Sequence, residues 1–565
     1  MSVVERTEKT STVERKGKIW WWWWAVGAAV VAWTWTQRGK WEGTPAEADG
    51  FSAAGARSAL RRIAKGVAWQ PSVPSTAKRP TSSRLKTRRC PPPENLLNVL
   101  VVPGFTSTPL ELWRSRPCAK IEPGLRRRLW GDARAAQAFL ADRMCWLEHM
   151  ALDPNTGTDP ENVAVRSVSG LEAVESLLGG YEVWARATQA WIAEGHGVDG
   201  LSALTFDWRL APEALDKRDA YFSRMRARIE SMTQRRPTAV VTHSYASLLF
   251  LAFLRWIESP QRQPGWTDKN VKAWVNLAGP IFGVPKALSA LLSGEMKDSA
   301  VMGELGVFLS NAVVPAQERT KLFRTWGSLL TMLPWPDNRV WTAAPGESDC
   351  MLRFGKEGDE RKTEDALRLL WNVTGSEYAT RCWEHRWAFK PVEHKGHGDL
   401  EDEQISGPYG LTLPDAPNME VYCLYGVGKP TERGYEYMWQ PGNIDQPLRL
   451  NATAHNPEKQ LQYGVYLGDG DGTVPLMSLG YMCNKGWRTK KYNPAGMRVV
   501  TREYKHNPVH FLKDMRGGPF SADHVDILLN EDMLADLVTI TGGDGNQLED
   551  DIHSAIEELV KEVDI

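Results

Sequence analysis

Residues 238–250, TAVVTHSYASLLF, run from a short apolar strand pattern through a polar turn into a long apolar helix pattern. Ser244 stands at the apex, which is the strand–turn–helix context of a nucleophile elbow. The elbow pattern has glycine two residues before and after the serine, because the backbone passes close to itself there. Thr242 and Ala246 occupy those positions in this chain. The alternative interpretation is a serine that caps the helix predicted from Tyr245 to Glu258.

Two downstream segments supply partners for Ser244. Asp471 follows an apolar strand pattern in YGVYLGDGDGTVP, residues 463–475, and His524 lies in SADHVDI, residues 521–527. The order Ser, Asp, His is that of α/β-hydrolases. In such a triad the aspartate orients the imidazole, which takes the serine proton and later returns it to a leaving group. Singly, each segment is more often a turn or a structural histidine, but together and in this order they favour a triad.

An upstream turn predicts an oxyanion hole. Asn98–Val102 has the pattern of a buried strand. It ends in Pro103-Gly104-Phe105, where glycine lets the backbone turn an amide toward a site. We expect the Phe105 and Tyr245 amides to be the two donors, each contributing roughly 3 kcal/mol to a tetrahedral oxyanion. An ordinary Pro-Gly turn at the end of a strand is the alternative.

Nine ordered segments across about residues 96–530 resemble the lecithin:cholesterol acyltransferase family, and within it the phospholipid:diacylglycerol acyltransferase branch. They are Pro103–Phe105, Glu111–Trp113, Cys145–His149, Phe206–Leu210, His243–Ser244, Asn276–Pro280 with Gly283–Lys286, Tyr422–Gly428, Gly470–Pro475 and Ala522–Asp526. The chain departs from the family at the elbow, where Tyr245 and Ala246 replace the usual Met and Gly.

The resemblance implies an α/β-hydrolase fold with lid and cap insertions and an acyltransferase triad of Ser244, Asp471 and His524. It also implies Phe105 and Tyr245 as oxyanion donors. Two disulfides follow from it, Cys118–Cys145 closing a lid loop and Cys423–Cys483. The implied acyl donor is a phospholipid and the acceptor diacylglycerol, giving triacylglycerol and lysophospholipid. The cysteines and histidines show no metal-ligand spacing, and we expect neither a metal ion nor a cofactor.

Two other hypotheses stand beside this phospholipid:diacylglycerol transfer. A sterol or water could replace diacylglycerol as the acceptor, which would make the protein a sterol acyltransferase or a phospholipase of the same family. Thr242 and Ala246 in the elbow also motivate a catalytically weak, membrane-tethered lipid-binding protein. Labelling with a fluorophosphonate separates an active elbow from an inert one.

An uncharged stretch near the N-terminus predicts a membrane anchor. Residues 19–36 contain five consecutive tryptophans and then AVGAAVVAW, which is about long enough to cross a bilayer. Trp33 and Trp35 stand where a signal-peptide cleavage site needs small residues, so we expect an uncleaved helix. More basic residues precede the stretch than closely follow it, which predicts a cytosolic N-terminus and a translocated body.

The cysteines agree with an oxidising compartment, because the two implied disulfides would need one. Asn372-Val373-Thr374 and Asn451-Ala452-Thr453 are glycosylation sequons that fit the same side of the membrane. We expect a single-pass protein of the endoplasmic reticulum membrane with a lumenal catalytic domain. The near-neutral net charge of −1 gives no sign of a nucleic-acid partner.

The predicted organisation has five parts. Residues 1–18 form a cytosolic tail, 19–36 the transmembrane anchor and 37–95 a flexible basic tether. Residues 96–540 form the catalytic domain, interrupted by a lid and cap at 105–195 and by a second insertion at 281–415, and 541–565 form a C-terminal tail. Both insertions are rich in tryptophan, including Trp113, Trp130, Trp146 and Trp184. Aromatic residues at their surface would suit an enzyme that meets its substrate at a bilayer, but for each tryptophan singly a place in the core is the better expectation. We expect Asp207 and Arg209 to form a structural ion pair.

Overall fold

The computed structural model describes residues 95–565 apart from 120, 178–179, 295–313, 342–349, 356–358, 375–409, 441, 444–445, 511–512 and 515. The predicted cytosolic tail, the transmembrane anchor and nearly all of the tether lie outside the described residues. Within them, no helix combines the length and the apolar character needed to cross a membrane.

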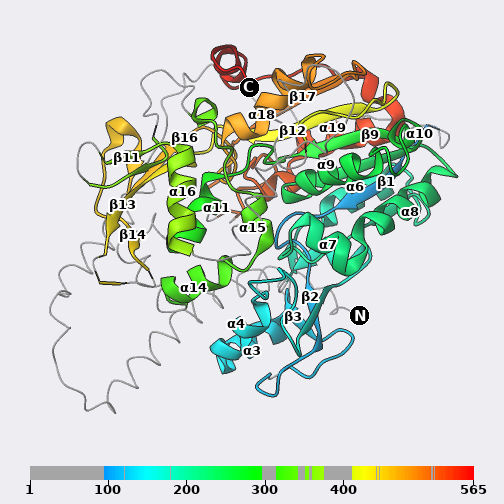
Figure 1. Cartoon of the computed structure of the whole chain (residues 1–565). Coiled ribbons are helices and arrows are strands. Elements are labelled where there is room, and N and C mark those ends of the chain that lie inside the picture. The colour runs from blue at the N-terminus through cyan, green and yellow to red at the C-terminus, as the bar shows by residue number, and fades with distance from the viewer. Residues whose placement is uncertain are drawn as a thin grey trace, which may run out of the picture.

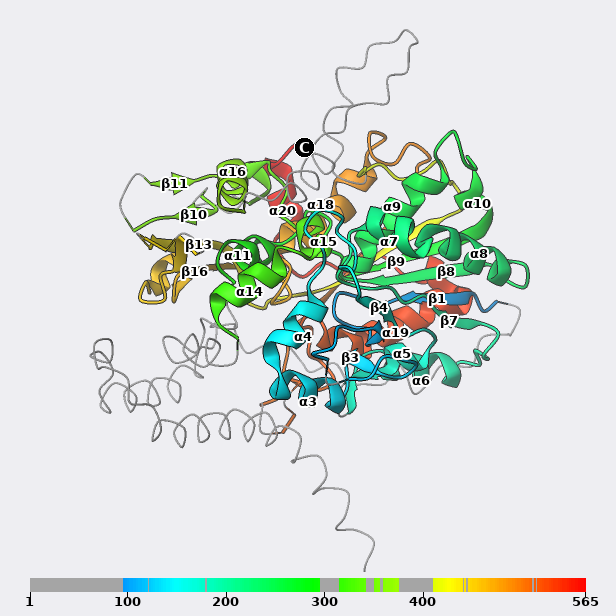
Figure 2. The ribbon, with the colours of Figure 1, turned by 60° about the horizontal axis from the view of Figure 1, so that its bottom comes forward.

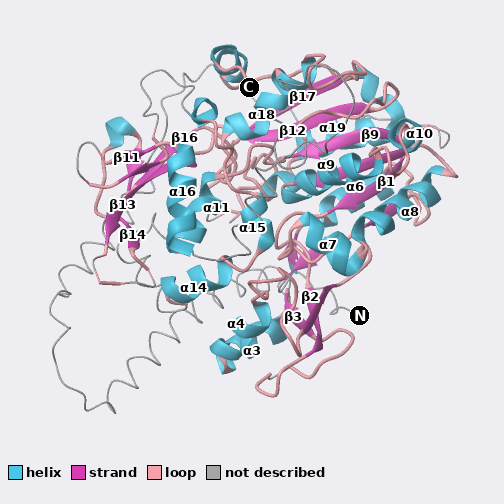
Figure 3. Ribbon diagram, in the orientation of Figure 1, coloured by secondary structure: helices cyan, strands magenta, loops and turns pink. Residues whose placement is uncertain are grey.

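A six-stranded parallel sheet forms the centre of the fold (Figures 1 and 3). Its strand order is β17 (Val499–Lys505), β12 (Glu420–Val427), β9 (Val271–Leu277), β8 (Thr238–His243), β1 (Asn98–Val102) and β7 (Leu201–Ala203). The inner strands β1 and β8 are buried at every residue. Their apolar runs fit this place, because parallel strands are covered on both faces.

Helices cover the two faces of this sheet. Figure 2 shows α8 (Tyr221–Thr233), α9 (Tyr245–Ile257) and α10 (Trp266–Asn270) on one face, and α6 (Ala185–Ala193) and α19 (Glu531–Thr539) on the other. Helix α7 (Pro212–Asp219) precedes α8, and α18 (Leu476–Asn484) packs on β12 and β17. The chain is therefore an α/β protein whose central strands end together at one edge.

The region expected as lid and cap, residues 105–195, carries its own small elements. Strands β3 (Arg128–Trp130), β2 (Leu110–Arg114) and β4 (Ala164–Ser167) form an antiparallel sheet. Helices α3 (Ala133–Ala141) and α4 (Arg143–Met150) pack beside it, and Asp132 and Asp142 cap their N-termini. Helix α5 (Glu172–Glu175) and the short pair β5 (Ser176–Leu177) and β6 (Tyr181–Glu182) follow.

A second sheet, which the sequence patterns did not indicate, stands beside the first (Figure 1). Its order is β11 (Glu360–Arg361), β10 (Leu352–Arg353), β13 (Thr431–Trp439), β16 (Val465–Gly468) and β15 (Leu461–Gln462), with β14 (Leu448–Leu450) also paired to β13. Helix α11 (Pro285–Ser293) packs on β13, and α14 (Ala316–Phe323), α15 (Gly327–Thr331) and α16 (Thr363–Thr374) lie in the same insertion. The connection from β12 to β17 thus contains strands β13 to β16.

The tail expected at residues 541–565 packs on the domain. Helix α20 (Ile556–Leu559) contacts α18, and its Ile556 side chain is fully buried. The Tyr481 hydroxyl donates to the Val563 carbonyl at 3.0 Å. These contacts make the last residues part of the layer that covers β12 and β17.

Candidate active site

Ser244 sits in a strained turn between β8 and α9. Its φ of 58° and ψ of −128° are unusual for a residue with a side chain. The Ser244 amide donates to the Leu277 carbonyl on β9 at 2.9 Å, which fixes the turn against the sheet. The side chain makes no capping hydrogen bond to α9, so the helix-capping interpretation is wrong. The turn leaves the hydroxyl available for another partner.

Thr242 and Ala246, the departures from the elbow pattern, are both completely buried. The Thr242 hydroxyl lies 2.9 Å from the Ser247 hydroxyl and accepts the Trp274 indole N–H at 2.9 Å. It also donates to the Val275 carbonyl at 3.3 Å. The threonine therefore fits the elbow because its hydroxyl joins β8, β9 and α9 in one hydrogen-bond network.

The three residues of the predicted triad come together at the ends of the strands. His524 Nε2 lies 2.8 Å from Ser244 Oγ, and His524 Nδ1 lies 2.6 Å from Asp471 Oδ2. This network requires the tautomer in which Nδ1–H donates to the carboxylate and Nε2 accepts the serine O–H. Asp471 is fully buried, and Ser244 and His524 are each only 6% exposed. The arrangement can move a proton from the serine to the imidazole while the carboxylate stabilises the resulting cation.

Asp471 is held by the backbone around it. Its Oδ1 accepts the amides of Thr473 at 2.9 Å and Val474 at 2.7 Å. Asp469, two residues earlier, points elsewhere and accepts the Gly428 and Gly470 amides at 2.7 Å each. Of the two aspartates in the Gly-Asp-Gly-Asp run, only Asp471 contacts the histidine.

His524 is positioned by its backbone as well as by its ring. The His524 amide donates to the Asp471 carbonyl at 2.9 Å. The loop that carries it approaches β12 at Gly426, where an added Cβ would lie 2.0 Å from the Ala522 carbonyl oxygen. Only glycine at position 426 leaves room for this contact.

A second histidine, His243, supports the first. Its Nε2–H donates to the His524 carbonyl at 2.9 Å, and the two rings are 5.1 Å apart. Burial and the neighbouring charge of His524 lower the pKa of His243 to about 3. His243 therefore stays neutral beside the site. Sequence reasoning missed this role, and its one signal was that His243 directly precedes Ser244.

The loop after β1 lies against the elbow. An added Cβ at Gly104 would meet Ser244 Cβ at 3.1 Å and His243 Nδ1 at 2.8 Å. Among the described residues, no acceptor is present for the neighbouring Phe105 N–H. Tyr245 begins α9 directly after Ser244, and its phenol donates to the Leu210 carbonyl at 2.9 Å. The two amides expected to bind an oxyanion thus belong to segments on either side of Ser244.

The ion pair expected between Asp207 and Arg209 is present and belongs to a buried network. Arg209 is fully buried and donates to both oxygens of Asp207, at 2.9 and 2.7 Å, and to Asp159 at 2.7 Å. Burial raises the pKa of the Asp207 carboxyl, but Arg209 and Arg218 outweigh it and hold that pKa at about 2. Asp159 lies in the region expected as lid and cap, so these charges tie that region to the segment after β7.

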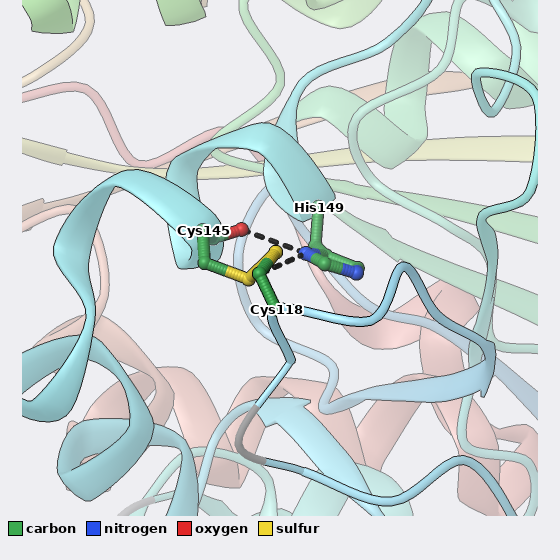
Figure 4. A group of neighbouring side chains, drawn as sticks. All are labelled: Cys118, Cys145 and His149. Carbon is green, nitrogen blue, oxygen red and sulfur yellow. Dashed lines mark hydrogen bonds between the residues drawn. A yellow bond between two sulfur atoms is a disulfide. The ribbon is translucent and has the colours of Figure 1, made fainter.

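The loop of residues 118–145, which we expect to be a lid loop, is closed by a disulfide between Cys118 and Cys145. Figure 4 shows His149, one turn later on α4, beside this bridge. Its Nδ1–H donates to the Cys145 carbonyl at 2.7 Å, and its Nε2 accepts the Arg116 amide at 3.0 Å. The sulfurs are bonded to each other and both ring nitrogens have backbone partners, so this cluster fastens the start of the lid loop to α4.

A second disulfide joins Cys423 on β12 to Cys483 on α18. Of the four tryptophans named for residues 105–195, Trp113 is 52% exposed, whereas Trp184 is fully buried. Trp130 and Trp146 are partly buried against the core. These tryptophans therefore serve mainly in packing, as expected for each of them singly, and Trp113 is the exposed one of the four.

Comparison with known proteins gives consistent matches over most of the chain. A profile described as lecithin:cholesterol acyltransferase matches residues 125–531. A protein named phospholipid:diacylglycerol acyltransferase from Schizosaccharomyces pombe is 34% identical, over 83% of this chain and 76% of its own length. One of the same name from Saccharomyces cerevisiae is also 34% identical, over 80% and 71%. Phospholipid:diacylglycerol acyltransferase 1 from Arabidopsis thaliana is 32% identical, over 83% and 84%.

Proposed function

The chain belongs to the lecithin:cholesterol acyltransferase family, and from this premise we propose that it moves a fatty acyl group from a phospholipid to diacylglycerol through an acyl-enzyme on Ser244. The products are triacylglycerol and a lysophospholipid. The observation that carries the proposal is the buried chain of hydrogen bonds from Ser244 through His524 to Asp471. The names of its relatives supply the donor and the acceptor.

The first half of the reaction forms the acyl-enzyme. Ser244 Oγ attacks the carbonyl carbon of a phospholipid ester while His524 Nε2 takes the hydroxyl proton. The negative charge that develops on the carbonyl oxygen faces the Phe105 and Tyr245 amides, which stabilise it. When the carbon–oxygen bond to the glycerol breaks, His524 returns the proton to the departing lysophospholipid.

The second half transfers the acyl group. The diacylglycerol hydroxyl gives its proton to His524 and attacks the acyl-enzyme, and the proton then returns to Ser244 as triacylglycerol leaves. Water could attack in the same way, so transfer requires a site from which water is excluded. The 6% exposure of Ser244 and of His524 supports that requirement.

The finer architecture follows the family. We infer an α/β-hydrolase fold in which residues 105–195 act as lid and cap and meet the membrane. Trp113, Leu125, Leu140 and Met144 are 52%, 71%, 52% and 51% exposed and all belong to this region. The exposed Arg126 and Arg127 follow Leu125 directly. Apolar side chains flanked by arginines suit a surface that enters anionic lipid head groups.

We further propose a single-pass protein of the endoplasmic reticulum membrane with residues 19–36 as the anchor and a lumenal catalytic domain. The two disulfides support an oxidising compartment for that domain. The basic residues before the uncharged stretch support a cytosolic N-terminus.

The test uses purified full-length protein in vesicles of phosphatidylcholine labelled in the acyl chain. Diacylglycerol, cholesterol or no acceptor is included, and the lipid products are resolved. We expect labelled triacylglycerol with diacylglycerol, and its loss by at least roughly a thousandfold in Ser244→Ala. Diacylglycerol is refuted as the acceptor if no labelled triacylglycerol forms and the label appears instead in sterol ester, or only in free fatty acid in every arm. Activity that survives in Ser244→Ala would refute the nucleophile.

A further inference from the structure

The loop that carries the Phe105 amide is held by an indole from the lid loop. Trp130, at the end of β3, donates its indole N–H to the Thr106 carbonyl at 3.1 Å. Thr106 has a φ of 57°, which residues with a side chain seldom adopt. Its hydroxyl bends back to the Phe105 carbonyl at 2.7 Å. The unusual backbone conformation of Thr106, directly after Phe105, is thus held by one hydrogen bond within the loop and by one from Trp130 outside it.

A second indole, from another segment of the chain, holds the same loop. Trp208, in the segment after β7, donates to the Thr108 carbonyl at 3.0 Å and is fully buried. The Phe105 ring contacts Trp208 edge to face, with centroids 5.2 Å apart, and Trp130 contacts Trp208 at 5.5 Å. Trp208 belongs to the core, whereas Trp130 belongs to the lid loop. The Phe105 loop thus receives one indole hydrogen bond from the core and one from the lid loop.

The strand that carries Trp130 is itself held by a residue next to the Cys118–Cys145 disulfide. Trp146, which directly follows Cys145 on α4, donates its indole N–H to the Leu129 carbonyl at 3.0 Å. Leu129 is 3% exposed and immediately precedes Trp130, so this bond fixes the strand that presents the Trp130 indole. The hydrogen bonds run from α4 through β3 to the loop beside Ser244.

We propose that Trp130 is a positioning residue for the acyl-transfer reaction: its indole N–H holds the Thr106 carbonyl and thereby aims the Phe105 amide at the developing oxyanion. The oxyanion hole is then complete only while the lid loop is docked on β2. This inference rests on the proposed function, because it needs Ser244 as the nucleophile and Phe105 as a donor.

The structure offers a graded set of variants. Trp130→Phe keeps an aromatic ring and removes only the N–H that reaches Thr106. Trp146→Phe removes the N–H one step further from the site. Trp266→Phe is the matched control, because Trp266 is 5% exposed and its indole N–H donates at 2.8 Å to Glu230, a bond that joins α10 to α8 and does not involve the Phe105 loop.

The assay measures kcat and KM of full-length protein on a short-chain water-soluble nitrophenyl ester in detergent, which removes any effect of membrane docking. We expect Trp130→Phe to lower kcat by roughly tenfold or more with KM nearly unchanged, since removing a whole donor costs about a hundredfold or more. Trp146→Phe should lower kcat less, and Trp266→Phe should leave it unchanged.

A trifluoromethyl ketone that adds to the serine supplies a readout that a merely structural role would not move. Its hemiketal oxygen occupies the oxyanion site, so its Ki in Trp130→Phe should rise by the factor by which kcat/KM falls. A raised KM with normal kcat, an unchanged Ki, or an equal loss in Trp266→Phe would overturn the inference. A lowered melting temperature in Trp130→Phe without a change in Ki would likewise assign Trp130 to stability alone.

The two proposals fail differently. If the proposed nucleophile is wrong, the wild-type protein and Ser244→Ala turn over the soluble ester equally. If only the role of Trp130 is wrong, Ser244→Ala is inactive and Trp130→Phe behaves as wild type.

Discussion

Replacing Asp471 with asparagine should abolish catalysis without disturbing the fold, because the neighbouring amides dictate how the new side chain must lie. The Thr473 and Val474 amides donate to Oδ1, so the asparagine oxygen must face them and its NH2 group must face His524 Nδ1. His524 must then carry its proton on Nε2. That tautomer cannot accept the Ser244 proton.

The magnitude follows from the loss of the base rather than from a change in binding. A wrong tautomer in a serine triad lowers kcat by about ten-thousandfold, which corresponds to about 5.5 kcal/mol of activation free energy. The assay is kcat on the soluble ester and acyl transfer in vesicles, with the melting temperature as a check on folding. KM should stay close to that of the wild type, because Asp471 is fully buried and reaches Ser244 only through His524.

Asp469→Asn is the matched control. Asp469 accepts the Gly428 and Gly470 amides through one oxygen, and asparagine retains an oxygen that can do the same. We expect its kcat to stay within about threefold of the wild type, an effect of the size that an exposed loop hydrogen bond produces. The reasoning is refuted if Asp469→Asn loses more activity than Asp471→Asn, or if Asp471→Asn keeps a tenth of the wild-type rate.

Three further outcomes can be measured directly. The pKa of His243 lies at about 3, below the ordinary value of about 6.5, so its stabilisation is complete above pH 6.5 and is lost as the pH falls toward 3. Between pH 7 and 4.5 the wild type should therefore lose ~2 to 3 kcal/mol of unfolding free energy through His243, and His243→Gln should show a smaller fall in melting temperature over this range. An equal fall in both proteins would count against this. Cys118→Ser with Cys145→Ser should reduce activity on a short soluble ester, because the Trp130 attachment loosens while the triad stays assembled, and should reduce activity on vesicles further, because the loop also loses its contact with the bilayer; equal losses would argue against an interfacial role for the loop. Deleting residues 1–45 should weaken apparent affinity for vesicles through lost effective concentration and leave turnover in micelles nearly unchanged; a folded but inactive truncation in micelles would make the anchor part of the catalytic architecture.

The parts of the site that sequence patterns could predict are those written in contiguous segments. The strand before Ser244 and the helix after it follow from the apolar periodicity of residues 238–250, and β1 has the bounds that its pattern indicates. The pairing of Ser244 with Asp471 and His524 followed from their order along the chain. The strands and the helix are local features, so a window of a dozen residues contains the necessary information. The triad was inferred from the order of three such segments and from the family resemblance.

The parts that could not be predicted depend on residues far apart in the chain. Thr242 departs from the elbow pattern in the sequence, and the sequence alone does not show why it fits. Its partners Trp274 and Ser247 come near it only when β8, β9 and α9 pack together. The Trp130 indole reaches Thr106 across 24 positions of the sequence. The second sheet escaped notice since β10, β11 and β15 have only two residues each, too few to show an alternating pattern.

The bond between Cys423 and Cys483 also determines how the second sheet can come apart. The two cysteines are separated by 60 positions, and strands β13 to β16 and Asp471 all lie between them. Closing a loop of that size removes about 4 kcal/mol of chain entropy from the opened state. If β13 to β16 unfold under thermal or mechanical stress, the two ends of this segment remain joined at β12 and α18. Asp471, which lies between them, therefore stays near the edge of the central sheet. After such opening, the oxidised protein should re-form the His524–Asp471 contact quickly. In the reduced protein the whole segment between β12 and β17 is free to move, so the same contact should re-form more slowly.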